Sequence, residues 1–142
     1  MTSMTGVRQR LARASCLPEL LDAAYDAFED MLTVIRRHDD PGSGWFTAMV
    51  MAAASAANGR DAVGWAPSLP LRRLHPDQPG EDAGRLQTAE AAAAWVASVC
   101  ELLAGRLDVG AAPDADPGDV AACRDAAGYA REVHALMGGG VT

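Results

Sequence analysis

Lysine is absent from the sequence, because all twelve basic side chains are arginines. Reactions that need a lysine, such as Schiff-base formation or charge neutralisation in a phosphate-binding loop, are therefore excluded. The chain also has no glycine-rich phosphate loop and no Gly-x-Ser-x-Gly nucleophile elbow. Isoleucine and asparagine occur once each, as Ile35 and Asn58, whereas alanine is abundant. This composition indicates a high-GC bacterial source.

Cysteine is scarce as well, and the three that occur are Cys16, Cys100 and Cys123. They form no Cys-x-x-Cys pair, and no histidine stands at zinc-finger spacing from them. We therefore predict reduced thiols, with no disulfide framework, no metal site and no cofactor. A nucleophilic pair of Cys100 with His134 would need antiparallel helices in the right register. The alternatives for His134 are a core histidine and a residue turned to the surface.

The chain has neither a surplus of basic charge nor a long apolar run. Its formal net charge of −7 argues against a nucleic-acid partner, because binding to phosphates needs a basic face. The longest apolar run, residues 48–57, is too short to span a bilayer. The first residues are interrupted by arginines and do not resemble a signal peptide. We therefore expect a soluble, cytoplasmic protein with no membrane partner.

Helical periodicity is the main signal that the sequence does contain. Apolar residues recur every three or four positions, and no period-two run of β-branched residues occurs. The 142 residues predict an all-α protein with a single helical-bundle domain over 1–142. Its ordered core is expected over about residues 5–137, with a Pro- and Gly-rich loop at 64–84 and a flexible tail at 138–142.

Signals for helix ends divide this core into an antiparallel bundle of four principal helices, with a short N-terminal helix and a long Pro-rich loop. Pro18 fits the first turn of the second helix, and Ser43 is the expected N-cap of the third. Gly59 is expected to end the third helix in a left-handed conformation. The five helices are predicted at residues 5–14, 18–40, 44–58, 82–107 and 116–137.

The fourth and fifth predicted helices carry apolar residues at alternating steps of three and four, as in a heptad seam. Trp95, Val99 and Leu102 add a second apolar stripe to the fourth helix. Because this is more apolar surface than one antiparallel bundle needs, we expect a homo-oligomer, most simply a dimer. The seam residues are Leu86, Ala89, Ala93, Val96, Cys100, Leu103 and Leu107, followed by Val120, Cys123, Ala127, Ala130, His134 and Met137.

A candidate ligand site lies at the junction of the second and third predicted helices. There the basic end of one helix meets the aromatic start of the next, which places polar groups beside an apolar wall. Trp65 is expected to return over this wall. In the alternative interpretation, Trp45 and Phe46 close the end of the bundle as part of the core. The site would consist of Arg37, His38, Trp45, Phe46, Met49 and Trp65.

The remaining polar residues show no convergent catalytic set. No Glu-x-x-His pair is present for a carboxylate-bridged metal site. Asp22, Asp26 and Glu29 line one helical stripe, which we interpret as a solvated outer face. We therefore expect a non-enzymatic bundle that acts by self-association or by binding a partner protein. The alternative is a bundle that binds a small apolar or aromatic molecule near Trp45 and Phe46, with an enzymatic activity in that pocket left open.

Overall fold

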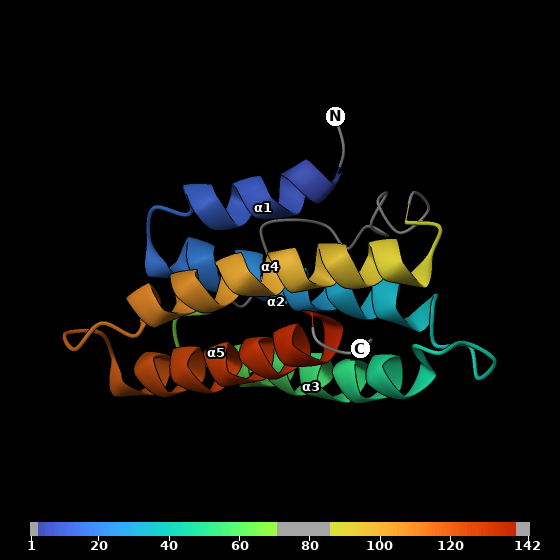
Figure 1. Cartoon of the computed structure of the whole chain (residues 1–142). Coiled ribbons are helices and arrows are strands. Elements are labelled where there is room, and N and C mark those ends of the chain that lie inside the picture. Colours follow the sequence, from blue (N-terminus) through green and yellow to red (C-terminus); the bar gives the residue numbers. More distant parts are fainter. Residues whose placement is uncertain (1–2, 71–85, 139–142) are drawn as a thin grey trace.

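The computed structural model describes residues 3–70 and 86–138, and within these ranges it contains five helices and no strand (Figure 1). The prediction of an all-α fold is therefore confirmed. None of the described helices is long and apolar enough to cross a membrane. The helices are α1 (Ser3–Arg13), α2 (Leu17–Arg36), α3 (Phe46–Gly64), α4 (Ala89–Gly110) and α5 (Pro117–Gly138).

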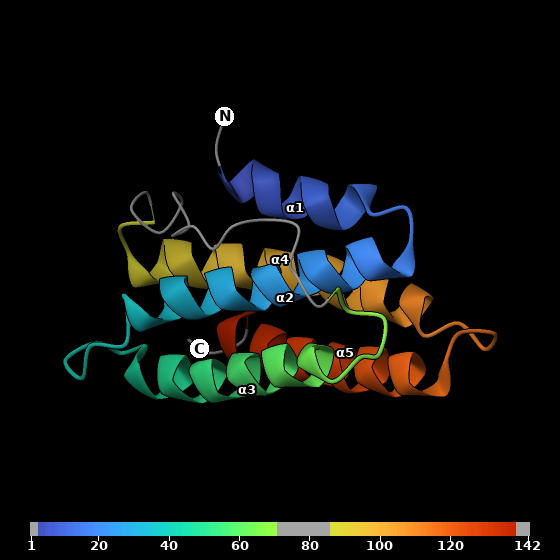
Figure 2. The same cartoon turned by 180° about the vertical axis from the view of Figure 1, so that it is seen from behind.

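Helices α2 to α5 form the four corners of a bundle in which each helix runs antiparallel to its two neighbours (Figures 1 and 2). In this arrangement α3 and α4 are diagonal to each other and run in the same direction. The end of α3 and the start of α4 therefore lie at opposite ends of the bundle, so the sequence between them has to be long enough to join these ends. Residues 71–85 and 139–142 of the predicted loop and tail lie outside the described residues.

The N-terminal helix α1 lies outside the four corners, over α2 and α4. Its Arg10 side chain reaches Asp26 of α2 at 2.9 Å and Asp22 at 3.6 Å. The Asp22 side chain is only 1% exposed. The interpretation of this acidic stripe as a solvated outer face is thus wrong for Asp22, because α1 covers it.

The start of α2 follows the sequence signals, whereas its end differs from the prediction. Pro18 lies in the first turn, and Glu19 accepts hydrogen bonds from the Ser15 N–H and hydroxyl. The helix ends at Arg36, four residues before Asp40. Its final turn tightens into bonds between residues three apart, with the His38 N–H donating to the Ile35 carbonyl.

Helix α3 continues past Asn58 to Gly64, so the predicted left-handed end at Gly59 is wrong. Gly59 has no positive φ and lies buried in the helix interior. A Cβ atom at this position would lie 2.4 Å from Cε1 of Phe28 on α2. The glycine therefore permits a close approach of two helices instead of a reversal of the chain.

Helices α4 and α5 bury most of the predicted seams inside the bundle. Val96, Cys100, Leu103 and Leu107 are 0% exposed, and Trp95 and Val99 of the second stripe are also buried. Near the end of α5, Val133 and Met137 are buried, whereas His134 is exposed. Thr88 caps α4 by accepting a hydrogen bond from the Ala91 N–H, and the helix ends one turn beyond the predicted Leu107.

The first turn of α5 anchors the segment that follows α3. Asp119 is 1% exposed, and its carboxylate accepts hydrogen bonds from the Ser68 N–H at 2.9 Å and the Ser68 hydroxyl at 2.5 Å. A Cβ atom at Gly118 would lie 2.8 Å from Pro67, so the two segments are in close contact. Asp119 thereby links the end of one corner helix to the start of another.

We expect Asp119→Ala to lower the free energy of unfolding by about 1–3 kcal/mol, because it leaves the Ser68 donors without their acceptor. Urea unfolding followed by circular dichroism measures this loss. Asp125→Ala, an exposed carboxylate on the same helix, is the matched control and should change stability by less than about 0.5 kcal/mol. Equal losses in the two variants would contradict the anchoring role of Asp119.

Candidate functional site

The structure places the residues of the predicted ligand site in different environments. Trp45 is 9% exposed and Met49 is 0% exposed, and both belong to the continuous apolar core. Phe46 is half-buried beside them. The prediction of Ser43 as the N-cap of this helix is wrong, because α3 begins at Phe46 and its N-cap is Trp45; the Ser43 hydroxyl instead accepts a hydrogen bond from the Trp45 backbone N–H in the turn before the helix. This geometry favours the interpretation in which Trp45 closes the bundle end.

Trp65 does not return over Trp45. Because α3 extends to Gly64, Trp65 follows its last turn and lies about 28 Å along the helix axis from the start of α3. Its side chain is 84% exposed. The structure therefore separates the two tryptophans that the sequence interpretation had combined.

The basic end of α2 is used for a structural contact. Arg37 is exposed at the C-cap, whereas His38 is half-buried and its Nε2 atom lies 2.7 Å from the Leu86 carbonyl oxygen. Leu86 lies just before α4, so the contact with His38 connects the end of α2 to the segment that precedes α4. His75 lies outside the described residues.

The buried cysteines are poor nucleophiles. The Cys100 thiol donates a hydrogen bond to the Met31 sulfur at 3.3 Å, and burial raises the pKa of Cys100 to about 12. Burial, and to a smaller extent the charge of Asp119, raises the pKa of Cys123 to about 11. Both thiols are thus protonated at neutral pH. Because Cys100 is buried and His134 is exposed, the structure does not form the Cys–His pair considered above.

Within residues 3–70 and 86–138, no group of three or more histidine, cysteine, aspartate or glutamate side chains could hold a metal ion. All described cysteines are free thiols, with Cys16 exposed and the other two buried. The candidate sites in the described part of the chain are therefore surfaces and cavities, not metal centres.

One surface that the sequence analysis missed is the outer face of α3. Positions spaced three or four apart are exposed along it, and they include Val50 at 45%, Met51 at 52% and Trp65 at 84%. We call this face the α3 stripe; it consists of Thr47, Val50, Met51, Ala54, Asn58, Asp61 and Trp65. Its signal in the sequence is the absence of any charged residue between Trp45 and Gly59, a pattern that is equally typical of a helix buried on all sides.

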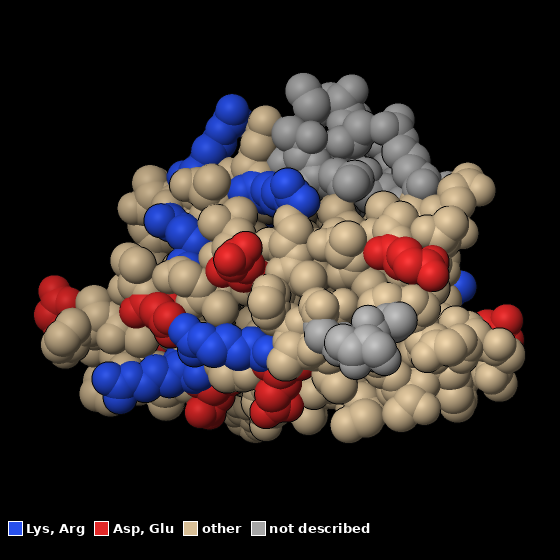
Figure 3. Space-filling view, viewed as in Figure 1, with Lys and Arg blue, Asp and Glu red and all other residues tan. Residues whose placement is uncertain are grey.

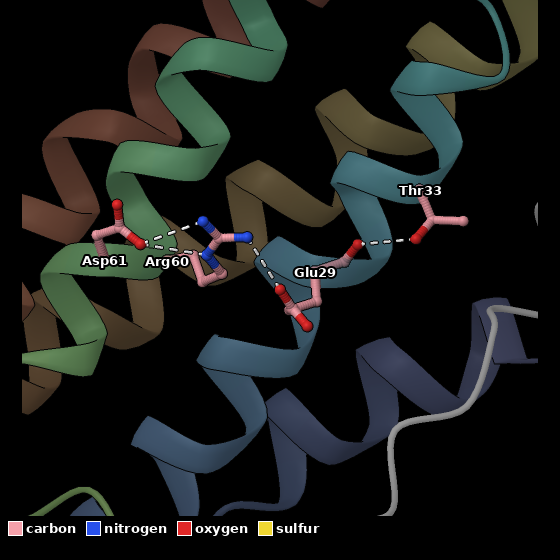
Figure 4. A network of polar contacts seen from close by, with 4 residues as sticks. All are labelled: Glu29, Thr33, Arg60 and Asp61. Atoms are coloured by element: carbon pink, nitrogen blue, oxygen red, sulfur yellow. Dashed lines mark hydrogen bonds and ion pairs between the residues drawn. The ribbon is translucent and has the colours of Figure 1, made fainter.

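Polar side chains border the α3 stripe where it passes α2 (Figure 4). Arg60 of α3 donates to Glu29 of α2 at 3.1 Å and also contacts its neighbour Asp61. Thr33 donates to the backbone carbonyl of Glu29. Within this network the Arg60–Glu29 ion pair joins α3 to α2, and the charged Asp61 separates Trp65 from the uncharged part of the stripe.

A second candidate is a cavity of about 260 Å³ at the end of the bundle where the α1–α2 turn meets the C-terminus of α4. Its walls are apolar except for Ser15, Cys16 and Arg106. On the face that Figure 3 shows, most arginine side chains lie on the half of the molecule that contains this end. Residues distant in sequence form this cavity, so no local pattern could reveal it.

Comparison of the chain with known proteins found no matching family model, no similar curated protein and no similar solved structure.

Proposed function

We propose that this protein acts without catalysis, as a helical bundle that associates with a second copy of itself through the α3 stripe. The observation that supports this proposal is the exposure of Val50, Met51 and Trp65 on one helix face. They are three of the four large apolar side chains that are exposed in the described part of the chain. Apolar side chains gathered on one face are typical of a protein contact surface.

The charge pattern of the α3 stripe favours a second copy over an unrelated charged partner. From Thr47 to Asn58 the stripe contains no ionisable side chain. The one charged residue of the stripe, Asp61, lies towards its end, so two such faces can meet in antiparallel order without bringing the two Asp61 carboxylates together, although the whole chain has a formal charge of −7. An isologous two-fold contact requires a surface of this kind, because each patch must be complementary to itself.

The order of residues along α3 also suits an antiparallel pair. With a two-fold axis at the level of Ala54 and Asn58, the Trp65 end of one helix lies beside the Thr47 and Met51 end of the other. Ala54 has a small side chain, so the helix axes can approach closely at the centre. The large indole of Trp65 would then cover apolar surface of the second copy at each end of the contact.

We expect the unaltered protein to form a dimer whose population rises with concentration, and Met51→Glu to shift it to monomer. The introduced carboxylate would have to be buried without a partner, which opposes association. Sedimentation equilibrium measures the change. Val109→Glu is the matched control, because Val109 is also an exposed apolar residue but lies on α4, and it should leave the dimer intact.

An unaltered protein that is monomeric at all accessible concentrations would contradict self-association. A dimer that both glutamate variants disrupt equally, or that neither disrupts, would contradict the assignment to the α3 stripe. The buried seams of α4 and α5 cannot serve as this surface, because they lie inside the bundle.

Two other functions have less support. Binding of a different protein would use the same α3 stripe, but the stripe has no charged pattern that would select such a partner. Binding of an apolar or aromatic molecule near Trp45 and Phe46 would have to displace core packing, because Trp45 and Met49 are buried.

A further inference from the structure

The cavity at the α1–α2 turn combines apolar walls with one cationic group. Leu17 and Leu20 of α2 and Val109 of α4 are the largest apolar side chains among its lining residues. Val109 lines this cavity, and its side chain is 69% exposed to solvent. Covering this surface with an apolar ligand would remove it from water, which is favourable.

The cationic group of the cavity is Arg106, whose partners differ from those of comparable arginines. Its Nε donates to the Leu11 carbonyl at 3.0 Å and its Nη2 to the Ala14 carbonyl at 2.6 Å. These bonds cap the last carbonyls of α1 but neutralise no charge. At least the Nη1 group retains its donors, and no carboxylate of the described residues forms an ion pair with Arg106.

This lack of a carboxylate partner distinguishes Arg106 from the other half-buried arginines of the described chain. Arg10 pairs with Asp26, and Arg60 pairs with Glu29. The carboxylate of Glu19 on α2 accepts hydrogen bonds from Ser15, and these bonds lower the pKa of Glu19. The positive charge of Arg106 is therefore not paired with a carboxylate of the described residues, and it lies beside an apolar cavity.

We propose that this cavity binds a small monocarboxylic acid with an apolar body, whose carboxylate pairs with Arg106 and whose body covers Leu17, Leu20 and Val109. A guanidinium forms its strongest contacts with a planar carboxylate, through two parallel hydrogen bonds. The volume of about 260 Å³ lies just below the usual range of ligand pockets, which begins at about 300 Å³. The ligand is therefore small, of the size of hexanoate or phenylacetate.

The reactivity of the Cys16 thiol can report whether a ligand occupies this cavity. Cys16 lines the cavity and is exposed, whereas Cys100 and Cys123 are buried. Alkylation of the folded protein by a maleimide should therefore proceed at Cys16, as peptide mass spectrometry would verify. We expect saturating hexanoate to slow this alkylation several-fold and 1-hexanol, which has the same body without the charge, to slow it much less.

Arg106→Gln tests the carboxylate contact, with Arg131→Gln as the matched control on the exposed surface of α5. Loss of a charged hydrogen bond should raise the hexanoate concentration needed for protection by about ten- to a hundredfold. The Arg131 variant should behave as the unaltered protein. Far-ultraviolet circular dichroism checks that each variant folds.

A second variant, Ala112→Phe, keeps Arg106 and fills the cavity from another wall. Its alkylation rate should no longer respond to hexanoate, and this test stands even if Arg106→Gln does not fold. The proposal is overturned if hexanoate leaves the alkylation rate of the unaltered protein unchanged, or if it protects Ala112→Phe equally well. Equal protection by hexanol and hexanoate would overturn the role of the carboxylate.

Discussion

Trp45→Ala is expected to lower the free energy of unfolding by about 3–5 kcal/mol, which is the usual loss for a large aromatic side chain removed from a core. Trp45 is 9% exposed and packs within the continuous apolar cluster at the start of α3. The space it leaves is bounded by other core side chains and cannot collapse fully. Urea unfolding monitored by circular dichroism measures the loss.

Trp65→Ala provides the matched control for Trp45, because it removes the same side chain from the opposite end of α3. Trp65 is 84% exposed, so its loss should change the stability of the monomer by less than about 0.5 kcal/mol. If Trp45→Ala instead costs little stability and abolishes binding of an aromatic ligand, Trp45 is the wall of a pocket. A large loss with no ligand effect assigns it to closing the bundle.

Phe28→Ala is the second change with a large expected effect, about 3–5 kcal/mol of unfolding free energy. Phe28 is 0% exposed, and its ring lies against the backbone of α3 at Gly59. Its removal opens a void between α2 and α3, which the rigid helix backbones cannot fill. Chemical denaturation under the same conditions as for Trp45 gives the comparison.

A substitution at Gly59, the other residue in this contact, provides a sharper test. Gly59→Ala would place a Cβ atom 2.4 Å from Cε1 of the fully buried Phe28 ring, so it should destabilise the protein by about 1–3 kcal/mol. Gly105→Ala in α4 is the matched control, because a Cβ atom there meets nothing within 4 Å. It should gain up to about 1 kcal/mol from higher helix propensity.

Coupling between the two positions follows from their contact. Phe28→Leu replaces the ring that a Cβ atom at position 59 would meet, so it should reduce the stability lost in Gly59→Ala. The double variant should therefore lose less unfolding free energy than the sum of the two single losses. Strict additivity of the two losses would contradict a direct contact between Phe28 and Gly59.

The sequence by itself determined the all-α class, the existence of the four principal helices and most of their inward faces. Local rules suffice for these features, because helix periodicity and capping depend on residues within one or two turns. Thus Val96, Cys100, Leu103 and Leu107 were correctly placed in the core from their spacing alone. The signal is strong wherever one continuous helix has a single buried face.

The tertiary structure decided how far helices extend and which apolar faces are covered. Gly59 looked like a helix end because glycine tolerates left-handed backbone, yet its role is to admit Phe28 from another helix. Because α3 continues through Gly59 to Gly64, Trp65 lies far from Trp45. Asp22 was predicted to be exposed, because the sequence of its own helix does not indicate that α1 covers it.

The two candidate surfaces depend on the tertiary structure for the same reason. The α3 stripe contains large apolar side chains, as the buried seam of α4 does, but α3 occupies a corner with no further helix outside it in the described chain, whereas α1 covers α4 on its outer side. The cavity beside Arg106 joins residues near position 15 to residues near position 110. Burial is set by how many neighbours a helix has, and only the packed bundle determines that number.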